Sequence, residues 1–543
     1  MWTDETGNAN HKNKITNTPI DGRRAGRRED CERVSEQTHA ACEPGWADRP
    51  AVRLVMHPRG PMPREINATD PAPIPRRALL QRTGMGMAWL GAASLLAADA
   101  EGAATAGPAA PPRDLAARPP HFAPRARAVI HIFANGGPSH VDTFDPKPAL
   151  DRHAGRELPG GPLKTERRTG TVLPSPFRFS RHGESGLPVS ELFPQVARHA
   201  DRLLVVRSMR ADVPNHEPSL MLMNCGDARL VRPSAGAWIT YGLGSENQNL
   251  PGFVALCPGG YPIKATENWR SAFLPAAFQA TYVDPRNRTV EELVAHLRHP
   301  VAAPAAQRRS FDLTLALDRR HAASRPGESA LDARLQTMEL AWRMQSEAGE
   351  AFDLSREPAH VRARYGDSVH GRQMLLARRL VERGVRYVQV WHGEGQPWDS
   401  HGNLVDNHRR LAAESDGPIA ALLDDLVRMG LLESTLVLWG GEFGRTPTAE
   451  MPNDAGANGT GRDHNHHGFS VWMSGGGVKG GTAYGATDEF GFKAVDKPVH
   501  VHDLHATMLH LLGLDHERLT FRHAGRDFRL TDVHGRVIHD WLA

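Results

Sequence analysis

Six short apolar segments, spaced along the C-terminal 420 residues or so, constrain the fold of this chain more than any other feature. They are AVIHIFA (128–134), LLVVRS (203–208), FVALC (253–257), VRYVQVW (385–391), STLVLWG (434–440) and GFSVWMSG (468–475). Near-continuous apolar strands with helices between them are typical of a parallel sheet covered on both faces. The sequence therefore predicts an α/β fold with a mostly parallel central sheet.

The segments between these strands carry helical patterns. The pattern is clearest in three stretches, at 372–383, 405–429 and 500–512. Residues 290–365 are rich in Ala, Arg and Glu and predict a helical insertion. The formal net charge of +3 on 543 residues is nearly balanced, so composition indicates neither a nucleic-acid partner nor a membrane-surface partner.

An export signal is predicted at residues 71–100. The pair Arg76 and Arg77 precedes a short apolar run that ends in small residues. This order is typical of a secretory signal, and the arginine pair favours the twin-arginine route. The alternatives are a helix with a chance arginine pair and an uncleaved membrane anchor, although the apolar run is short for a membrane span. We therefore expect a periplasmic or extracellular protein with no stable membrane span after signal removal.

The segments around this signal are not expected to fold with the domain. Residues 1–70 are polar and aperiodic, which predicts a disordered or mis-annotated extension with the true start at Met56 or Met62. Residues 101–124 are rich in Ala and Pro and predict a linker. Residues 125–543 remain as one domain.

Polar loops rich in His, Asp and Glu adjoin four of the predicted strands. NGGPSHVDTFD follows the first strand, HGEGQPWDSHGN follows the fourth, EFGRTP follows the fifth, and GRDHNHH precedes the sixth. In open α/β sheets, ligands bind beyond the carboxyl ends of the strands. Provided that the strands are parallel, we expect these four loops to form one site.

The side chains in these loops suit a divalent metal ion: zinc, manganese, magnesium or calcium. The candidate ligands are Asp142, Asp399, His401, Glu442, His464, His466 and His467. Alternatives remain open for three of these assignments. Glu442 could form an ion pair with Arg445, Asp142 could stabilise the turn before Pro146, and the histidine cluster at 464, 466 and 467 could belong to a solvated loop.

Two residues are candidates for catalysis. His216 lies in NHEPS, where Pro218 and the following apolar run predict a helix start, and a helix N-terminus favours an anion. That position suits a nucleophile or a phosphate-like ligand, and the alternative is that His216 only caps the helix. The planar fork of Arg445 suits a tetrahedral oxyanion. Cys225 and Cys257 could pair with each other or remain free thiols.

Several longer motifs resemble the DUF1501 family of exported proteins. They are HIFANGGPSHVDTFDPKP, RPSAGAWITYGLGSENQNLPGFV, CPGGYP, WDSHGN and LWGGEFGRTP, and the resemblance covers nearly all of 125–543. The wider resemblance is to the alkaline phosphatase/sulfatase superfamily, which implies a three-layer sandwich. HEPSLMLMNCG is similar to the sulfatase segment that carries the nucleophile, which implies that His216 occupies that position.

The same resemblance implies roles for other residues and shows departures from the superfamily pattern. LVLWGGEFG is similar to the strand that ends in a metal-binding Asp-Asn, so Glu442 stands on the aspartate and Phe443 replaces a second ligand. His466 matches the metal-binding histidine of the phosphatases. Asn135 stands where the first metal-binding aspartate is expected, and we include it among the candidate ligands.

Residues and resemblance together imply an exported metal-dependent hydrolase of phosphate or sulfate esters, acting on a small-molecule or glycan ester. The preferred ligands are Asp399, His401, Glu442 and His466. His216 would be the nucleophile or a further ligand, and Arg445 would bind the anion. A histidine nucleophile suits phosphoryl transfer, which favours phosphate. The alternative is an inactive superfamily member that binds an anionic or glycan ligand, because the expected nucleophile and two expected metal ligands are replaced.

Overall fold

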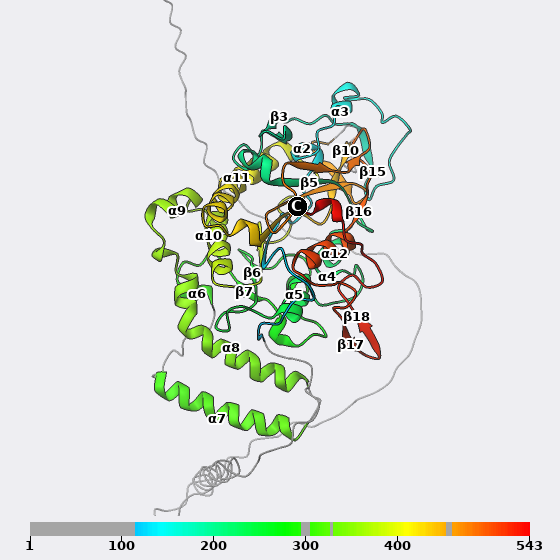
Figure 1. The fold of residues 1–543 in the computed structure, drawn as a ribbon. Coiled ribbons are helices and arrows are strands. Elements are labelled where there is room, and N and C mark those ends of the chain that lie inside the picture. The colour runs from blue at the N-terminus through cyan, green and yellow to red at the C-terminus, as the bar shows by residue number, and fades with distance from the viewer. Residues whose placement is uncertain (1–114, 295–303, 326–328, 452–458) are drawn as a thin grey trace, which may run out of the picture. The chain divides into compact units, whose positions relative to one another are not determined.

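The computed structural model describes residues 115–294, 304–325, 329–451 and 459–543 (Figure 1). The predicted extension, the export signal and most of the predicted linker lie outside the described residues, so these remain predictions. No helix within the described ranges is long and apolar enough to cross a membrane.

A nine-stranded sheet forms the centre of the domain (Figure 1). The strand order is β13-β5-β12-β9-β1-β8-β6-β7, and β16 pairs with β5. The strands are β1 (Ala128–Phe133), β5 (Leu203–Arg210), β6 (Phe253–Leu256), β7 (Thr281–Val283), β8 (Tyr387–Trp391), β9 (Thr435–Gly440), β12 (Phe469–Ser474), β13 (Thr482–Tyr484) and β16 (Val499–His500). All six strands predicted from the sequence are present, as β1, β5, β6, β8, β9 and β12.

Strand β12 runs opposite to the rest of this sheet. It is antiparallel to both of its neighbours, β5 and β9, whereas the other pairings in the sheet are parallel. Its first residue, Phe469, pairs with Met209 near the end of β5. The prediction of one site rests on the condition that all the strands bordering it are parallel, and this condition is wrong for β12. A parallel β12 would have carried its preceding loop to the opposite edge, and its reversal places GRDHNHH at the common rim.

Helices cover both faces of the sheet. On one face, α10 (Val369–Glu382) and α11 (Leu404–Arg428) pack against a core that includes Ile130. On the other, the helices pack against a core that includes Val129; they are α4 (His216–Cys225), α5 (Ala235–Leu243) and α12 (Val501–Leu511). Ile130 and Val129 belong to opposite cores because successive side chains of a strand point to opposite faces. The predicted three-layer α/β sandwich is confirmed.

The predicted helical insertion is also present. It contains α6 (Val290–Leu293), α7 (Pro304–Ala323), α8 (Ser329–Phe352) and α9 (Ala359–Tyr365), of which α7 and α8 lie side by side (Figure 1). Cys225 and Cys257 are buried free thiols, each hydrogen-bonded to a backbone carbonyl.

Short elements complete the described fold. A three-stranded sheet has the order β11-β10-β2, with β2 (Thr169–Val172), β10 (Gly444–Glu450) and β11 (Arg462–Asn465). Strands β10 and β11 are antiparallel and place Arg445 opposite His464. The remaining α-helices and strands are α2 (His140–Thr143), α3 (Pro148–Arg152), β3 (Phe179–His182), β4 (Leu187–Ser190), β14 (Ala486–Thr487), β15 (Ala494–Asp496), β17 (Phe521–His523) and β18 (Arg526–Phe528).

Candidate metal centre

Four side chains converge at the rim where the parallel strands end. His216 is the first residue of α4, Asp399 and His401 lie in the loop between β8 and α11, and His464 lies on β11. One ligand atom from each side chain lies within 4.8 Å of all the others. The carboxylate of Asp399 is the common neighbour, with oxygens 3.3, 3.0 and 3.2 Å from the Nε2 atoms of His216, His401 and His464.

Each of these three histidines contacts a second carboxylate through its other ring nitrogen. The pairs are His216 Nδ1–Glu442 at 2.6 Å, His464 Nδ1–Glu166 at 2.7 Å, and His401 Nδ1–Glu450. In metalloproteins such a carboxylate holds the proton on one ring nitrogen and leaves the lone pair of the other for the metal. The arrangement therefore presents three Nε2 lone pairs beside the carboxylate of Asp399.

These residues fit a divalent metal ion. The Nε2 atoms of His216 and His401 are buried and make no hydrogen bond of good geometry within the described residues. Buried polar atoms normally have a partner, and a cation bound here would supply one to both atoms. The carboxylates at this rim also outnumber the cationic side chains that contact them. Burying this excess negative charge costs free energy, which a bound cation would offset. Three imidazoles and a carboxylate suit zinc in particular.

The electrostatics keep these groups ready to bind a cation. Burial opposes ionisation of Asp399, but the three histidines and Arg445 hold the pKa of its carboxyl well below its usual value. Burial lowers the pKa of His464 to about 3, so its ring is neutral at physiological pH. Burial also lowers the pKa of His216, but Asp399 and Glu442 raise it above its ordinary value. A cation at this position would compete with that proton.

The loop that carries Asp399 is fixed by the turn after β1. Asn135 donates to the carbonyls of Gly393 and Gly395, at 3.1 and 2.7 Å. Gly136 has a φ of +108°, and a Cβ there would lie 2.6 Å from the backbone nitrogen of Asp399. Only glycine allows this close approach. Asn135, a candidate ligand by resemblance, thus holds the loop and is not among the four converging side chains.

Arg445 lies behind the cluster and is fully buried. Its guanidinium donates to Asp399 at 2.7 Å and to backbone carbonyls that include Gly137, at 2.8 Å. Arg445 therefore pairs with Asp399, and Glu442 pairs with His216, which answers the alternative of a Glu442–Arg445 pair. Arg445 has no exposed surface, and its guanidinium is engaged by Asp399 and these carbonyls; its role toward an anion stays a prediction.

A family match agrees with the motifs quoted from the sequence. The pattern of DUF1501, described as a protein of unknown function, matches residues 126–542. The chain belongs to the DUF1501 family. None of the curated proteins matches this chain.

Solved structures with a similar arrangement share little sequence with this DUF1501 protein. One is the PsFucS1 sulfatase from Pseudoalteromonas sp., at 13% identity and a TM-score of 0.30 over 72% of this chain and 68% of that chain. Another is the lipoteichoic acid synthase LtaP from Listeria monocytogenes, at 8% identity and a TM-score of 0.30 over 74% of this chain and 76% of that chain. A third is the C-terminal periplasmic domain of EcEptC from Escherichia coli in complex with Zn, at 9% identity and a TM-score of 0.32 over 76% of this chain and 88% of that chain. These scores are too low to carry an argument about the site.

Three other candidate ligands of the DUF1501 protein lie outside the cluster. Asp142 is fully buried and forms a two-point ion pair with Arg462, at 2.8 and 3.2 Å. His466 and His467 pack against each other with ring centroids 3.9 Å apart, and neither belongs to a group of converging ligand atoms within the described ranges. We therefore do not include these three in the proposed ligand set.

Sequence reasoning missed the carboxylates behind the histidines. Glu166 lies in the loop before β2, Glu450 ends β10, and Asp463 lies on β11 beside His464. Glu166 and Glu450 each form a further group of possible ligands with Asp463. Glu166 does so with His464, and Glu450 does so with His401. The Nδ1 atoms of these two histidines are already bonded to Glu450 and Glu166, so we assign the carboxylates to a supporting role. Neither Glu166 nor Glu450 lies in a motif that could have revealed it.

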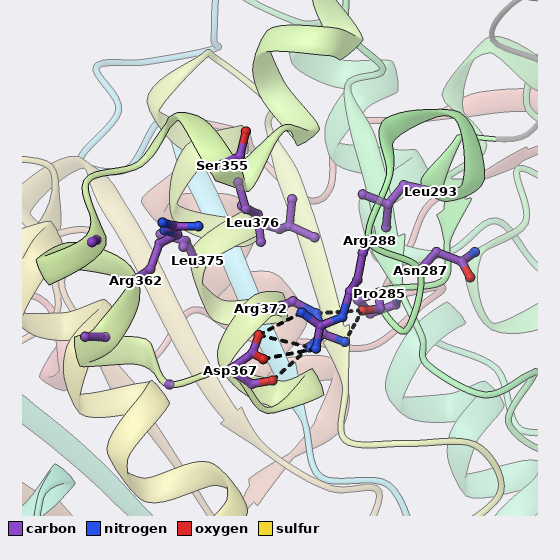
Figure 2. A pocket seen from close by; sticks show the side chains of 14 residues that line it. Pro285, Asn287, Arg288, Leu293, Ser355, Arg362, Asp367, Arg372, Leu375 and Leu376 are labelled. Atoms are coloured by element: carbon purple, nitrogen blue, oxygen red, sulfur yellow. Dashed lines mark hydrogen bonds and ion pairs between the residues drawn. The ribbon is translucent and has the colours of Figure 1, made fainter.

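A hollow at the β7 edge of the central sheet is lined by other residues than the metal centre. It has a volume of about 460 Å³ and lies beyond β7, between the loop at 285–288 and helices α9 and α10 (Figure 2). Figure 2 shows Arg288 and Arg372 turned toward Asp367, and both arginines are bonded to it. Its charged groups are thus largely paired with one another.

The supporting role of Glu442 predicts a measurable effect on metal affinity. We expect Glu442→Gln to weaken metal binding about 10- to 100-fold, because the neutral amide no longer orients and polarises His216. Competition with a chromophoric zinc chelator measures the affinity. Glu433→Gln, on an exposed side chain, is the matched control. Equal affinities for the two variants would show that Glu442 does not act through His216.

Proposed function

We propose that this protein is a metal-dependent hydrolase of phosphate or sulfate esters. The observation that carries the proposal is the convergence of three Nε2 atoms on Asp399, with a carboxylate behind each ring. His216, Asp399, His401 and His464 would hold the metal. A bound divalent cation supplies an activated water and polarises an ester oxygen.

His216 acts as a ligand in this proposal and not as the nucleophile. Glu442 holds its Nδ1 atom, and its Nε2 atom, beside Asp399, would bind the metal, so neither nitrogen would be left to attack the substrate. A histidine nucleophile needs one free nitrogen facing the substrate. Water is therefore the proposed nucleophile, which removes the argument that favoured phosphate over sulfate.

Access to the cluster supports a catalytic role. The side chains of Asp399 and His401 are 22% and 18% exposed, whereas that of His464 is 3% exposed. The exposed side of the cluster is thus the side of the β8–α11 loop. A catalytic metal needs an open coordination position, and we place it on this side.

The second candidate function is ligand binding without catalysis. Four protein ligands can fill a tetrahedral shell, and closed shells are typical of structural metal sites. In that case a bound metal would hold the rim loops in place for an anionic or glycan ligand.

A hydrolysis assay distinguishes these functions. The chain is loaded separately with zinc, manganese, magnesium and calcium and assayed with p-nitrophenyl phosphate, bis(p-nitrophenyl) phosphate and p-nitrophenyl sulfate. We expect turnover that stops on chelation, returns with metal, and falls by at least about 100-fold in Asp399→Asn. Stoichiometric metal without turnover of any ester would favour the binding function.

A further inference from the structure

A second polar hollow, of about 500 Å³, opens at the sheet edge where β5 and β16 end. Arg210 ends β5 and pairs in register with His500, which ends β16. The hollow is lined by these two residues, by His502 in the first turn of α12, and by His534 and Arg536 near the C-terminus. None of the five belongs to a group of converging metal ligands within the described ranges. The side chains that line this hollow are therefore separate from those of the metal centre.

The two carboxylates at this hollow are engaged by the protein itself. Asp503 accepts the backbone N–H groups of His500, at 3.0 Å, and of Arg536, at 2.9 Å. Asp212 lies 3.0 Å from the Nε2 atom of His500. These contacts cap α12 and orient the His500 ring.

The two arginines at this hollow keep hydrogen-bond donors for a ligand. The exposed guanidinium of Arg210 makes no hydrogen bond to any residue that the structure describes. Arg536 is 65% exposed; its Nε atom lies 3.7 Å from the carboxylate of Asp503, and another of its nitrogens donates to the carbonyl of Pro498, at 3.1 Å. A guanidinium can only donate, so a ligand that engages both arginines must supply acceptors.

A buried histidine adds an independent observation. Among the residues that the structure describes, the Nδ1 atom of His502 finds no hydrogen-bond partner, and the residue is 5% exposed. Its ring stacks on His534 with centroids 5.1 Å apart. Leaving a buried ring nitrogen without a partner costs desolvation free energy, and because His502 lines the hollow, a ligand there can supply that partner. The start of the 11-residue helix α12 adds a partial positive charge.

We propose that this hollow is a binding site for a phosphate or sulfate group, separate from the metal centre. The two guanidinium forks match the oxygens of a tetrahedral anion, and His502 adds a third contact. Ligand chemistry of this kind is shared by a free inorganic anion and by a group carried on a larger molecule.

The position of the hollow suggests which substrate class would use it. Arg210 and His216 are six residues apart, so their Cα atoms lie within about 21 Å of each other. An ester with two anionic groups on one chain would span this distance. The proposed substrate class is therefore a polyanionic ester, such as a multiply sulfated or phosphorylated glycan. This extension rests on the proposed hydrolase function, whereas the anion site does not.

Calorimetric titration of the chelator-treated full chain tests the anion site. The probes are inorganic phosphate, inorganic sulfate and sucrose octasulfate, which separate a free anion from a carried group by their relative affinities. We expect binding that weakens at least about tenfold in the double variant Arg210→Gln, Arg536→Gln, because two charge-assisted contacts are lost. Arg522→Gln, on a 67% exposed side chain of β17, is the control and should bind like the parent.

Three results would overturn the proposal. They are no binding of any probe to the parent, equal affinity in parent and double variant, and loss of binding in His464→Ala to the same extent as in the double variant. The last result would place the anion at the metal centre. An Asp399→Asn variant that loses hydrolysis but keeps anion binding would separate this site from the proposed catalytic function.

Discussion

Replacing His464 with alanine is expected to remove stoichiometric metal from the protein. His464 would supply one of four ligands, and its loss would also leave Glu166 without its histidine partner. Mutation of a residue that is hydrogen-bonded to a metal ligand already lowers metal affinity about 10- to 100-fold. Loss of the ligand itself should therefore lower metal affinity more than about 100-fold. Elemental analysis of dialysed protein measures the bound metal, and equilibrium dialysis measures the affinity.

His466→Ala is the matched control, because it changes the same residue type two positions further along the chain. Its ring packs on His467 and not on Asp399, so this variant should keep its metal. Zinc should also raise the thermal midpoint of the parent and of His466→Ala, but not that of His464→Ala. Metal loss in His466→Ala with retention in His464→Ala would contradict the proposed ligand set and restore the assignment made from resemblance.

The second large effect is expected at the buried ion pair between Asp142 and Arg462. Both side chains are fully buried, so Arg462→Met leaves an uncompensated carboxylate in the interior. Breaking one partner of a buried pair costs about 3–5 kcal/mol of the free energy of unfolding. Chemical denaturation followed by tryptophan fluorescence measures this loss. Arg152→Met, at an exposed ion pair with Glu489, should leave stability nearly unchanged.

The same variant should show a characteristic pH dependence. Burial opposes ionisation of Asp142, but Arg462 holds its pKa below the usual value in the folded parent. A lowered folded-state pKa stabilises the protein above the unfolded-state pKa of about 4, and this contribution is lost as the pH falls. Without Arg462, burial raises that pKa instead. The stability difference between parent and variant should therefore be largest above about pH 5 and shrink toward pH 4, and a constant difference would contradict this account.

Much of the fold follows from short-range patterns in the sequence. The six strands and the helices at 372–383, 405–429 and 500–512 were predictable, because a continuous apolar run or a helical repeat depends on neighbouring residues. The position of the polar loops at strand ends also indicated a common rim. Asp399, His401 and His464 were predicted as ligands from their residue types, and the structure brings these three together with His216.

What only the tertiary structure decided are the direction of β12 and the identity of the contacts at the rim. The sequence shows that β12 is a strand but not whether it runs with or against β9, because both directions bury the same side chains. Which of the histidines at 464, 466 and 467 reaches Asp399 depends on the register of β11 against β10, which pairs His464 with Arg445. The His464–Glu166 pair joins residues 298 positions apart, and the His216–Glu442 pair joins residues 226 positions apart. Such pairs form only after the chain has folded, so the local sequence carries no signal for them.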